Sequence, residues 1–411
     1  MNLNINGRDY PWPKQPTVVI CVDGCEPEYI DEAIKAGVMP FMQQMLARGS
    51  KLRANCVIPS FTNPNNISIV TGVPPSVHGI CGNYFLDPEN GEPVMMNDPK
   101  FLRCGTILAA FAKAGARIAV VTAKDKLRAP LGHELPMESG RVVCFSSEKA
   151  DQVTREVNGL PEALEFVGLP LPSVYSAELS EFVLAAGVKL LESDSWDLMY
   201  LSTTDYIQHK NAPGTPLANS FYAMMDCYLA KLDALGATIA ITADHGMKPK
   251  HDDLGRPNVI YLQTLLDNLL GEGKTRVILP ITDPYVVHHG ALGGFAVIHL
   301  SDEHLMAEIT ELLGKVTGIS EVLPRKIACS KFELPEDREG DLIVVSDSDF
   351  VLGIRPEDHD LSQLHVPLRS HGGTSEQVVP MLLNRRCDSA SLGRPLRNFD
   401  AYYLALNPIS E

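Results

Sequence analysis

This 411-residue chain has few of the features that mark secreted or membrane-spanning proteins. Its nine cysteines are odd in number and form no CxxC motif, which argues against a disulfide framework and favours reduced, buried thiols. No apolar run approaches the roughly 20 residues that a membrane-spanning helix needs. The first residues have neither the basic segment nor the apolar core of a signal peptide. We therefore expect a cytoplasmic protein with no membrane partner.

Positive charge is also scarce. The chain has 35 Lys and Arg against 51 Asp and Glu, a formal charge of −16, and it has no long basic cluster. This balance argues against nucleic acid as the main partner. An acidic protein that acts on an anionic substrate needs local positive charge at its site, and bound metal ions would supply it. The size and acidity are compatible with a homodimer.

The first 250 residues alternate between strand-like and helix-like stretches. Apolar runs that predict strands lie at 17–22, 115–122, 198–204 and 237–243. Patterns near helical spacing lie at 28–48, 106–114, 178–193 and 219–235. This alternation predicts an α/β fold in which helices sandwich a largely parallel central sheet.

The pattern changes after residue 252, where short strands predominate. We expect helices at 258–270 and 302–317, and strands at 276–279, 284–288, 294–299, 326–332 and 341–345. Such a mixture indicates a small α+β cap domain at 253–368, inserted into a hydrolase core formed by 1–252 and 369–411. The cap would cover the strand ends and shape a substrate pocket.

Three carboxylates follow three of the predicted strands directly. They are Asp23, Asp205 and Asp244, with His209 four residues after the second and His245 next to the third. The carboxyl ends of strands in an open α/β sheet line one crevice, so these side chains should converge. Carboxylates and imidazoles together suit zinc or a similar divalent ion. Two such ions would form a clamp for phosphoryl transfer.

Thr62 lies where an apolar run ends and a helix can begin, at 66–70. A hydroxyl at a helix N-terminus gains from the nearby backbone N–H groups and from the helix dipole. Each of these residues has an ordinary explanation when taken alone, because Thr often caps a helix and Asp often ends a strand. The Asp205 and His209 pair could equally be structural. Only their joint occurrence indicates a site.

The joint pattern resembles the alkaline phosphatase superfamily, and within it the nucleotide pyrophosphatase/phosphodiesterase branch. The resemblance covers essentially the whole predicted core. The stretches that carry it are Val-Asp23-Gly, Pro-Ser-Phe-Thr62-Asn-Pro, Thr-Gly-Val-Pro-Pro-Ser-Val-His78-Gly-Ile-Cys-Gly-Asn83, Asp205-Tyr-Ile-Gln-His209, Asp244-His-Gly-Met and His371-Gly-Gly.

The resemblance implies two Zn2+ ions and a covalent mechanism. One ion would be held by Asp205, His209 and His371, and the other by Asp23, Thr62, Asp244 and His245. Thr62 would be the nucleophile and would form a phospho-enzyme intermediate. Asn83 would donate a hydrogen bond to a phosphoryl oxygen.

Within this branch the chain is most similar to the members that hydrolyse phosphonoacetate, in its length, its compact insert and the segment Ala-Lys124-Asp-Lys126. Cleavage of a carbon–phosphorus bond expels a carbanion, which needs an adjacent carboxylate and cations close to it. Lys124 and Lys126 follow the strand predicted to end at 122, and a spacing of two on a strand points both side chains to one face. The same segment could instead be a solvated loop.

The leading prediction is thus a di-zinc hydrolase that cleaves phosphonoacetate, a small anionic phosphonate, into acetate and phosphate. The alternative is a nucleotide pyrophosphatase/phosphodiesterase that acts on phosphodiesters with the same metal site. A third class is a metal-stabilised binding or structural protein without turnover. Thr62 argues against that class, because a structural zinc site is closed by four side chains and needs no hydroxyl.

Overall fold

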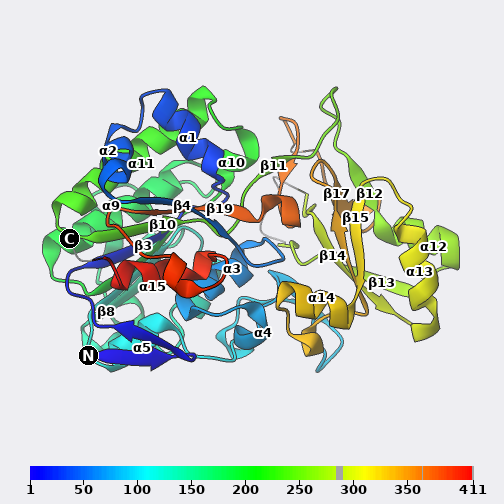
Figure 1. The fold of residues 1–411 in the computed structure, drawn as a ribbon, viewed down its shortest axis with the longest axis horizontal. Coiled ribbons are helices and arrows are strands. Elements are labelled where there is room, and N and C mark those ends of the chain that lie inside the picture. Colours follow the sequence, from blue (N-terminus) through cyan, green and yellow to red (C-terminus); the bar gives the residue numbers. More distant parts are fainter. Residues whose placement is uncertain (284–289, 363, 410–411) are drawn as a thin grey trace.

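A seven-stranded sheet forms the core of the larger part of the molecule (Figure 1), in a computed structural model that describes residues 1–283, 290–362 and 364–409. Its strand order is β4 (Ser50–Asn55), β19 (Val378–Leu383), β10 (Thr238–Thr242), β3 (Thr17–Cys21), β9 (Leu198–Ser202), β7 (Ile118–Thr122) and β8 (Val142–Ser146). The strands from β10 to β8 pair in parallel, and β19 runs antiparallel to both of its neighbours. The predicted α/β class with a largely parallel sheet is confirmed.

Helices cover both faces of this sheet (Figure 1). One layer contains α1 (Pro27–Lys35), α2 (Pro40–Arg48), α9 (Glu178–Ser193) and α11 (Pro216–Ala234). The other contains α3 (Thr62–Thr71), α5 (Ile107–Lys113), α6 (Asp125–Leu131) and α15 (Ala401–Leu406). Every residue of the five strands from β10 to β8 is buried, as expected for a sheet covered on both faces.

One expectation for the core was wrong in detail, and one strand was missed. The single helix expected at 28–48 is two helices, because Gly37 adopts a φ of 74° after α1 and Pro40 starts α2 afresh. The edge strand β8 was not predicted, although its sequence Val-Val-Cys-Phe-Ser is a short apolar run typical of a buried strand.

Short elements complete this part of the chain. They are the hairpin of β1 (Asn2–Ile5) with β2 (Arg8–Pro11), the pair β5 (Tyr84–Leu86) and β6 (Pro93–Met95), and the helices α4 (Pro75–His78), α7 (Arg155–Asn158), α8 (Ala163–Val167) and α10 (Tyr206–Lys210).

The chain leaves and re-enters the core through one short antiparallel pair, β11 (Lys248–Pro249) with β18 (Arg369–Ser370). Between them lies an antiparallel sheet in the order β13 (Thr275–Ile278), β14 (Phe295–Leu300), β16 (Leu342–Ser346), β15 (Ile319–Pro324). The other elements there are the parallel pair β12 (Val259–Tyr261) and β17 (Val351–Gly353), and the helices α12 (Leu262–Leu270), α13 (Met306–Leu313) and α14 (Arg325–Phe332). We refer to residues 250–368 as the insert; the domain boundaries predicted at 253 and 368 stay a prediction.

One element of the insert was assigned to the wrong class. Residues 326–332 were expected to form a strand but belong to α14, whose buried Ala328, Cys329 and Phe332 lie on one helical face. The helix expected at 302–317 is shorter, and the strand β15 that follows it was missed. The strand expected at 284–288 lies outside the described residues.

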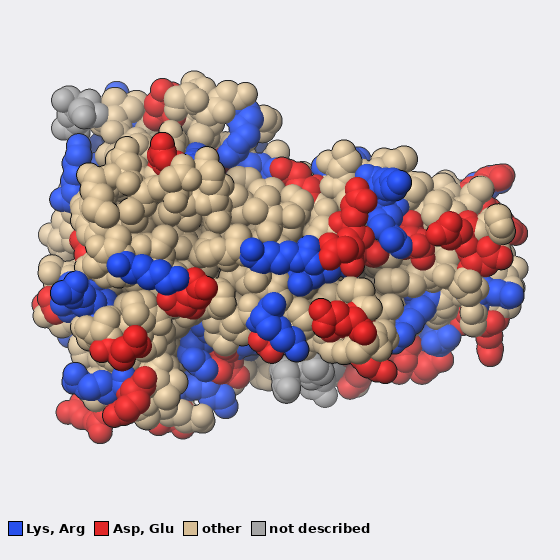
Figure 2. Space-filling view, turned by 90° about the horizontal axis from the view of Figure 1, so that it is seen from below, with Lys and Arg blue, Asp and Glu red and all other residues tan. Residues whose placement is uncertain are grey.

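The helices, the cysteines and the surface charges can each be compared with what the composition led us to expect. None of the helices in the described ranges is both long and apolar enough to cross a bilayer. All nine cysteines lie within the described ranges and all are free thiols. On the face seen in Figure 2, basic side chains are scattered among acidic ones, and acidic side chains gather over the end formed by the insert.

Candidate metal centre and pocket

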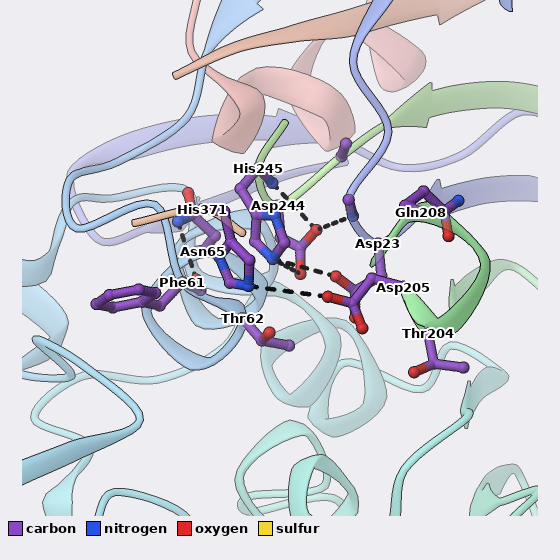
Figure 3. A network of polar contacts seen from close by, with 12 residues as sticks. Asp23, Phe61, Thr62, Asn65, Thr204, Asp205, Gln208, Asp244, His245 and His371 are labelled. Carbon is purple, nitrogen blue, oxygen red and sulfur yellow. Dashed lines mark hydrogen bonds and ion pairs between the residues drawn. The ribbon is translucent and has the colours of Figure 1, made fainter. Parts of the chain in front are cut away.

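The strand ends bring the predicted site residues together. Asp23 follows β3, Asp205 follows β9 and precedes α10, and Asp244 and His245 follow β10. Thr62 is the first residue of α3, His209 lies in α10, and His371 follows β18 at the point where the chain returns from the insert. All seven side chains are buried or nearly so, and Figure 3 shows Asp205 linked to His371 with Thr62 close by.

One group of possible metal ligands consists of Asp205, His209 and His371, whose ligand atoms lie within 4.8 Å of one another. Asp205 Oδ2 is 2.8 Å from His209 Nε2 and 3.8 Å from His371 Nε2. These are the three residues that the family resemblance assigned to one ion.

A second group consists of Asp23, Asp205 and His245. Asp23 Oδ1 is 3.2 Å from His245 Nε2. Asp244 lies beside it, 3.7 Å from His245 Nε2, and its carboxylate accepts hydrogen bonds from Gly24 N (3.2 Å) and from the Asn66 amide (3.3 Å). Asp205 is thus common to both groups, and the assignment of Asp244 and Thr62 to the second ion stays a prediction.

Backbone carbonyl groups orient the rings of the three histidines. Each Nδ1–H donates to a backbone carbonyl, of Arg369 for His209 (2.8 Å), of Gly246 for His245 (2.9 Å) and of Ser60 for His371 (2.7 Å). The rings of His245 and His371 also stack, 3.5 Å apart and 6° from parallel. Such bonds fix the tautomer and turn Nε2 towards the carboxylates, as is usual for metal-binding histidines.

The electrostatics of the cluster favour a bound cation. Burial, with the neighbouring charges of Asp205 and Asp244, raises the pKa of Asp23 well above its usual range. Burial lowers the pKa of His245, but Asp244 and Asp23 outweigh it and raise this pKa to about 10. Buried atoms Asp23 Oδ1 and His245 Nε2 both lack a hydrogen-bond partner of good geometry. Asp23 and His245 thus hold protons at a point where a bound cation could neutralise the carboxylates instead, so the residues fit divalent metal ions.

A pocket opens beside these groups. Its lining includes Thr62, 8% exposed, and Asn83, 4% exposed. Asn83 Oδ1 accepts a hydrogen bond from the backbone N–H of Asn63 (2.9 Å), which leaves its amide group to act as a donor. The geometry therefore brings a hydroxyl at a helix N-terminus and an amide donor next to the carboxylates and histidines.

Lys124 and Lys126 line the same pocket. The reason given for their placement was wrong, because neither lies on a strand: β7 ends at Thr122, Lys124 is the N-cap of α6 and Lys126 lies in its first turn. The solvated-loop alternative is wrong as well, since Lys126 has a side chain only 16% exposed. Burial lowers the pKa of Lys124, and the nearby Lys126 adds to this effect, while Glu148 opposes it.

Sequence reasoning expected the insert to shape the pocket but did not identify the residues that line it. Ile281 and Asp283 line it from the insert, and Thr203 and Thr204 line it from the segment after β9. Thr203 Oγ1 also accepts a hydrogen bond from the backbone N–H of Asp23 (3.1 Å). Thr203 and Thr204 could have been predicted as pocket residues because they lie at the end of a predicted strand. Asp283 has no sequence motif around it that would identify it.

The fold and this site define a class of protein. The chain belongs to the type I phosphodiesterase/nucleotide pyrophosphatase family, whose sequence pattern matches residues 17–374. The predicted family is thereby confirmed.

Among individual proteins, the chain is similar to phosphonoacetate hydrolase from Sinorhizobium meliloti 1021. The two are 58% identical over 99% of this chain and 98% of that one, with a TM-score of 0.95, and crystal structures of that enzyme contain phosphonoacetate or phosphonoformate. An uncharacterized pyrophosphatase/phosphodiesterase from Schizosaccharomyces pombe is 25% identical over 57% of this chain, which spans only 45% of that protein. The alkaline phosphatase PafA shares the fold, with a TM-score of 0.67 at 16% identity over 95% of this chain and 94% of PafA.

Proposed function

We propose that this chain is a di-metal hydrolase that cleaves the carbon–phosphorus bond of phosphonoacetate and gives acetate and phosphate. The observation that carries the proposal is that Lys124 and Lys126 line the same pocket as Thr62 and as members of both carboxylate and histidine groups, namely Asp23, Asp205 and His371. Metal ions held by the carboxylates and histidines would bind the phosphonate group, and the two lysine ammonium groups would bind the carboxylate. The similarity to the Sinorhizobium meliloti enzyme, in structures with phosphonoacetate and phosphonoformate, supports this substrate class.

The residues that would hold two zinc ions are those named from the resemblance. Asp205, His209 and His371 would bind one, and Asp23, Thr62, Asp244 and His245 the other. When bound, the ions supply Lewis acidity that lowers the pKa of a coordinated hydroxyl and neutralises the charge of the phosphonate.

Thr62 would attack phosphorus in line, since its hydroxyl lies at the N-terminus of α3 in the pocket. A new O–P bond forms as the P–C bond breaks, and the electron pair of the P–C bond moves onto carbon. The adjacent carboxylate delocalises this charge, and the ammonium groups of Lys124 and Lys126 stabilise it. The proton that the Thr62 hydroxyl gives up balances the one that the departing carbon takes up to become acetate. Asn83 donates a hydrogen bond to the phosphoryl group throughout.

Water then hydrolyses the phosphothreonine and releases phosphate, which restores the Thr62 hydroxyl. The overall reaction consumes one water molecule for each phosphonoacetate.

A nucleotide pyrophosphatase/phosphodiesterase activity on phosphodiesters is the second candidate. The family match over residues 17–374 favours it, because the same metal ligands and nucleophile serve both reactions. The two candidates differ in what they require of the lysines, since a phosphodiester has no carboxylate to hold.

Replacing both Lys124 and Lys126 with alanine tests the substrate assignment. We expect the double variant to lose at least about 10²-fold in kcat/KM for phosphonoacetate, because the carboxylate and the developing carbanion lose their cations. Its zinc content should match that of the wild type, measured by elemental analysis. The matched control is Lys113→Ala, which removes a largely exposed lysine of α5. Unchanged phosphonoacetate kinetics in the double variant would remove the lysines from the mechanism and favour the phosphodiesterase.

A further inference from the structure

A buried ion pair joins the pocket to the insert. Lys126 Nζ lies 2.6 Å from Asp283 Oδ2, and the two side chains are 16% and 2% exposed. Lys126 comes from the first turn of α6 in the core, and Asp283 follows β13 in the insert. The ammonium that would serve the carboxylate end of the substrate is therefore paired with a carboxylate of the protein that lines the same pocket.

The segment that carries Asp283 is also anchored at the phosphoryl end of the pocket. The backbone N–H groups of Asn83 and Tyr84 both donate to the carbonyl of Pro280, at 2.9 and 3.2 Å. A turn in which Thr282 N–H donates to Leu279 O (2.9 Å) then leads to Asp283. The short run 279–283 thus contacts Asn83 through its backbone and Lys126 through its last side chain.

A carboxylate beside Lys126 is unexpected in a pocket for an anion. By charge alone, Asp283 opposes a substrate carboxylate in the ground state. Geometry gives Asp283 a role, because a lysine ammonium on a flexible four-carbon stem stabilises a transition state only if its position is fixed beforehand. An ammonium has three donors, so Lys126 can bind Asp283 and a substrate at the same time.

We propose that Asp283 is a positioning residue of the insert, which holds the Lys126 ammonium where negative charge develops on the departing carbon. The inference rests on the proposed phosphonoacetate hydrolysis and adds a role for the insert in it. The proposal makes different predictions for kcat and for KM. Asp283 stabilises the transition state through Lys126, which raises kcat, but it does not favour binding of the substrate anion and so does not lower KM.

The test is a double-mutant cycle on the zinc-loaded full chain with phosphonoacetate as substrate. Asp283→Ala should lower kcat by about 10-fold or more and leave KM unchanged or lower, because an opposing negative charge is gone. Asp283→Asn keeps an acceptor oxygen for Lys126 and should recover part of kcat. In a Lys126→Ala background, Asp283→Ala should change kcat by less than about twofold, because the residue through which it acts is absent.

The control is Asp337→Ala, which breaks another ion pair between the insert and the core, with Arg103 at 2.9 Å, outside the pocket. It should change neither kcat nor KM. Thermal unfolding of each variant separates a loss of folding from a loss of rate. An equal loss of kcat with and without Lys126, or a rise in KM at constant kcat, would overturn the role of Asp283 alone. A wild-type protein that releases no phosphate from phosphonoacetate would overturn the proposed function as well.

Discussion

Replacing Thr62 with alanine is expected to lower kcat for phosphonoacetate by at least about 10³-fold, because the reaction loses its nucleophile. The fold should survive, since Thr62 is the first residue of α3 and the cap residue before it is Phe61. Most of the metal should remain, because carboxylates and histidines make up the rest of both ligand sets. Steady-state kinetics and elemental analysis of the purified variant measure both quantities.

The matched control is Thr62→Ser, which keeps the hydroxyl and removes only a methyl group. We expect this variant to stay within about tenfold of the wild-type kcat. A Thr62→Ala protein that keeps its metal and still releases phosphate at a near-wild-type rate would contradict covalent catalysis by Thr62. It would then leave direct attack by water as the remaining route.

Replacing Lys250 with methionine is expected to destabilise the protein by about 3–5 kcal/mol, the usual cost of stranding a buried charge. Both side chains of the Lys250–Glu376 pair are fully buried, with Nζ 2.9 Å from Oε1 of the glutamate. Lys250 Nζ also donates to Ser348 O (2.7 Å) in the insert, and Glu376 Oε2 accepts from Gly373 N–H (3.0 Å). The pair therefore ties the loop that carries His371 to the insert. Urea unfolding gives the free energy of unfolding.

The double variant Lys250→Met/Glu376→Gln should recover a large part of the lost stability, because no charge is then left unpaired. The control is Lys315→Met, whose partner Glu311 is mostly exposed and whose loss should leave the free energy of unfolding nearly unchanged. Equal destabilisation by Lys250→Met and Lys315→Met would show that the buried Lys250–Glu376 pair contributes no more to the free energy of unfolding than an exposed pair does.

Much of the core was predictable because its strands are buried on both faces and therefore consist of apolar runs. The runs before Asp23, Asp205 and Asp244 identify three neighbouring strands, and their carboxyl ends form the site. The insert was harder. Residues 326–332 were assigned to a strand because a short segment with few apolar residues has no decisive period, and only packing shows which face is buried.

The site was predictable where a side chain follows a strand and not where it is recruited by tertiary contacts. Asp205, His209 and His371 form a group in the structure as the resemblance implied. Asp283 and Glu376 could not be found from the sequence, since each acquires its partner through a contact more than a hundred residues away. The lysines were found for the wrong reason, because the strand ends at Thr122 and both lysines lie at the start of α6, a helix that was not predicted.

Substrate preference tests the central claim most directly. The zinc-loaded protein would be assayed side by side for phosphate release from phosphonoacetate and for nitrophenol release from bis(para-nitrophenyl) phosphate. The account predicts rapid phosphate release from phosphonoacetate and slow cleavage of the diester. Rapid diester cleavage with inert phosphonoacetate would contradict it, and would place the chain among the phosphodiesterases of its family, with Lys124 and Lys126 outside the chemistry.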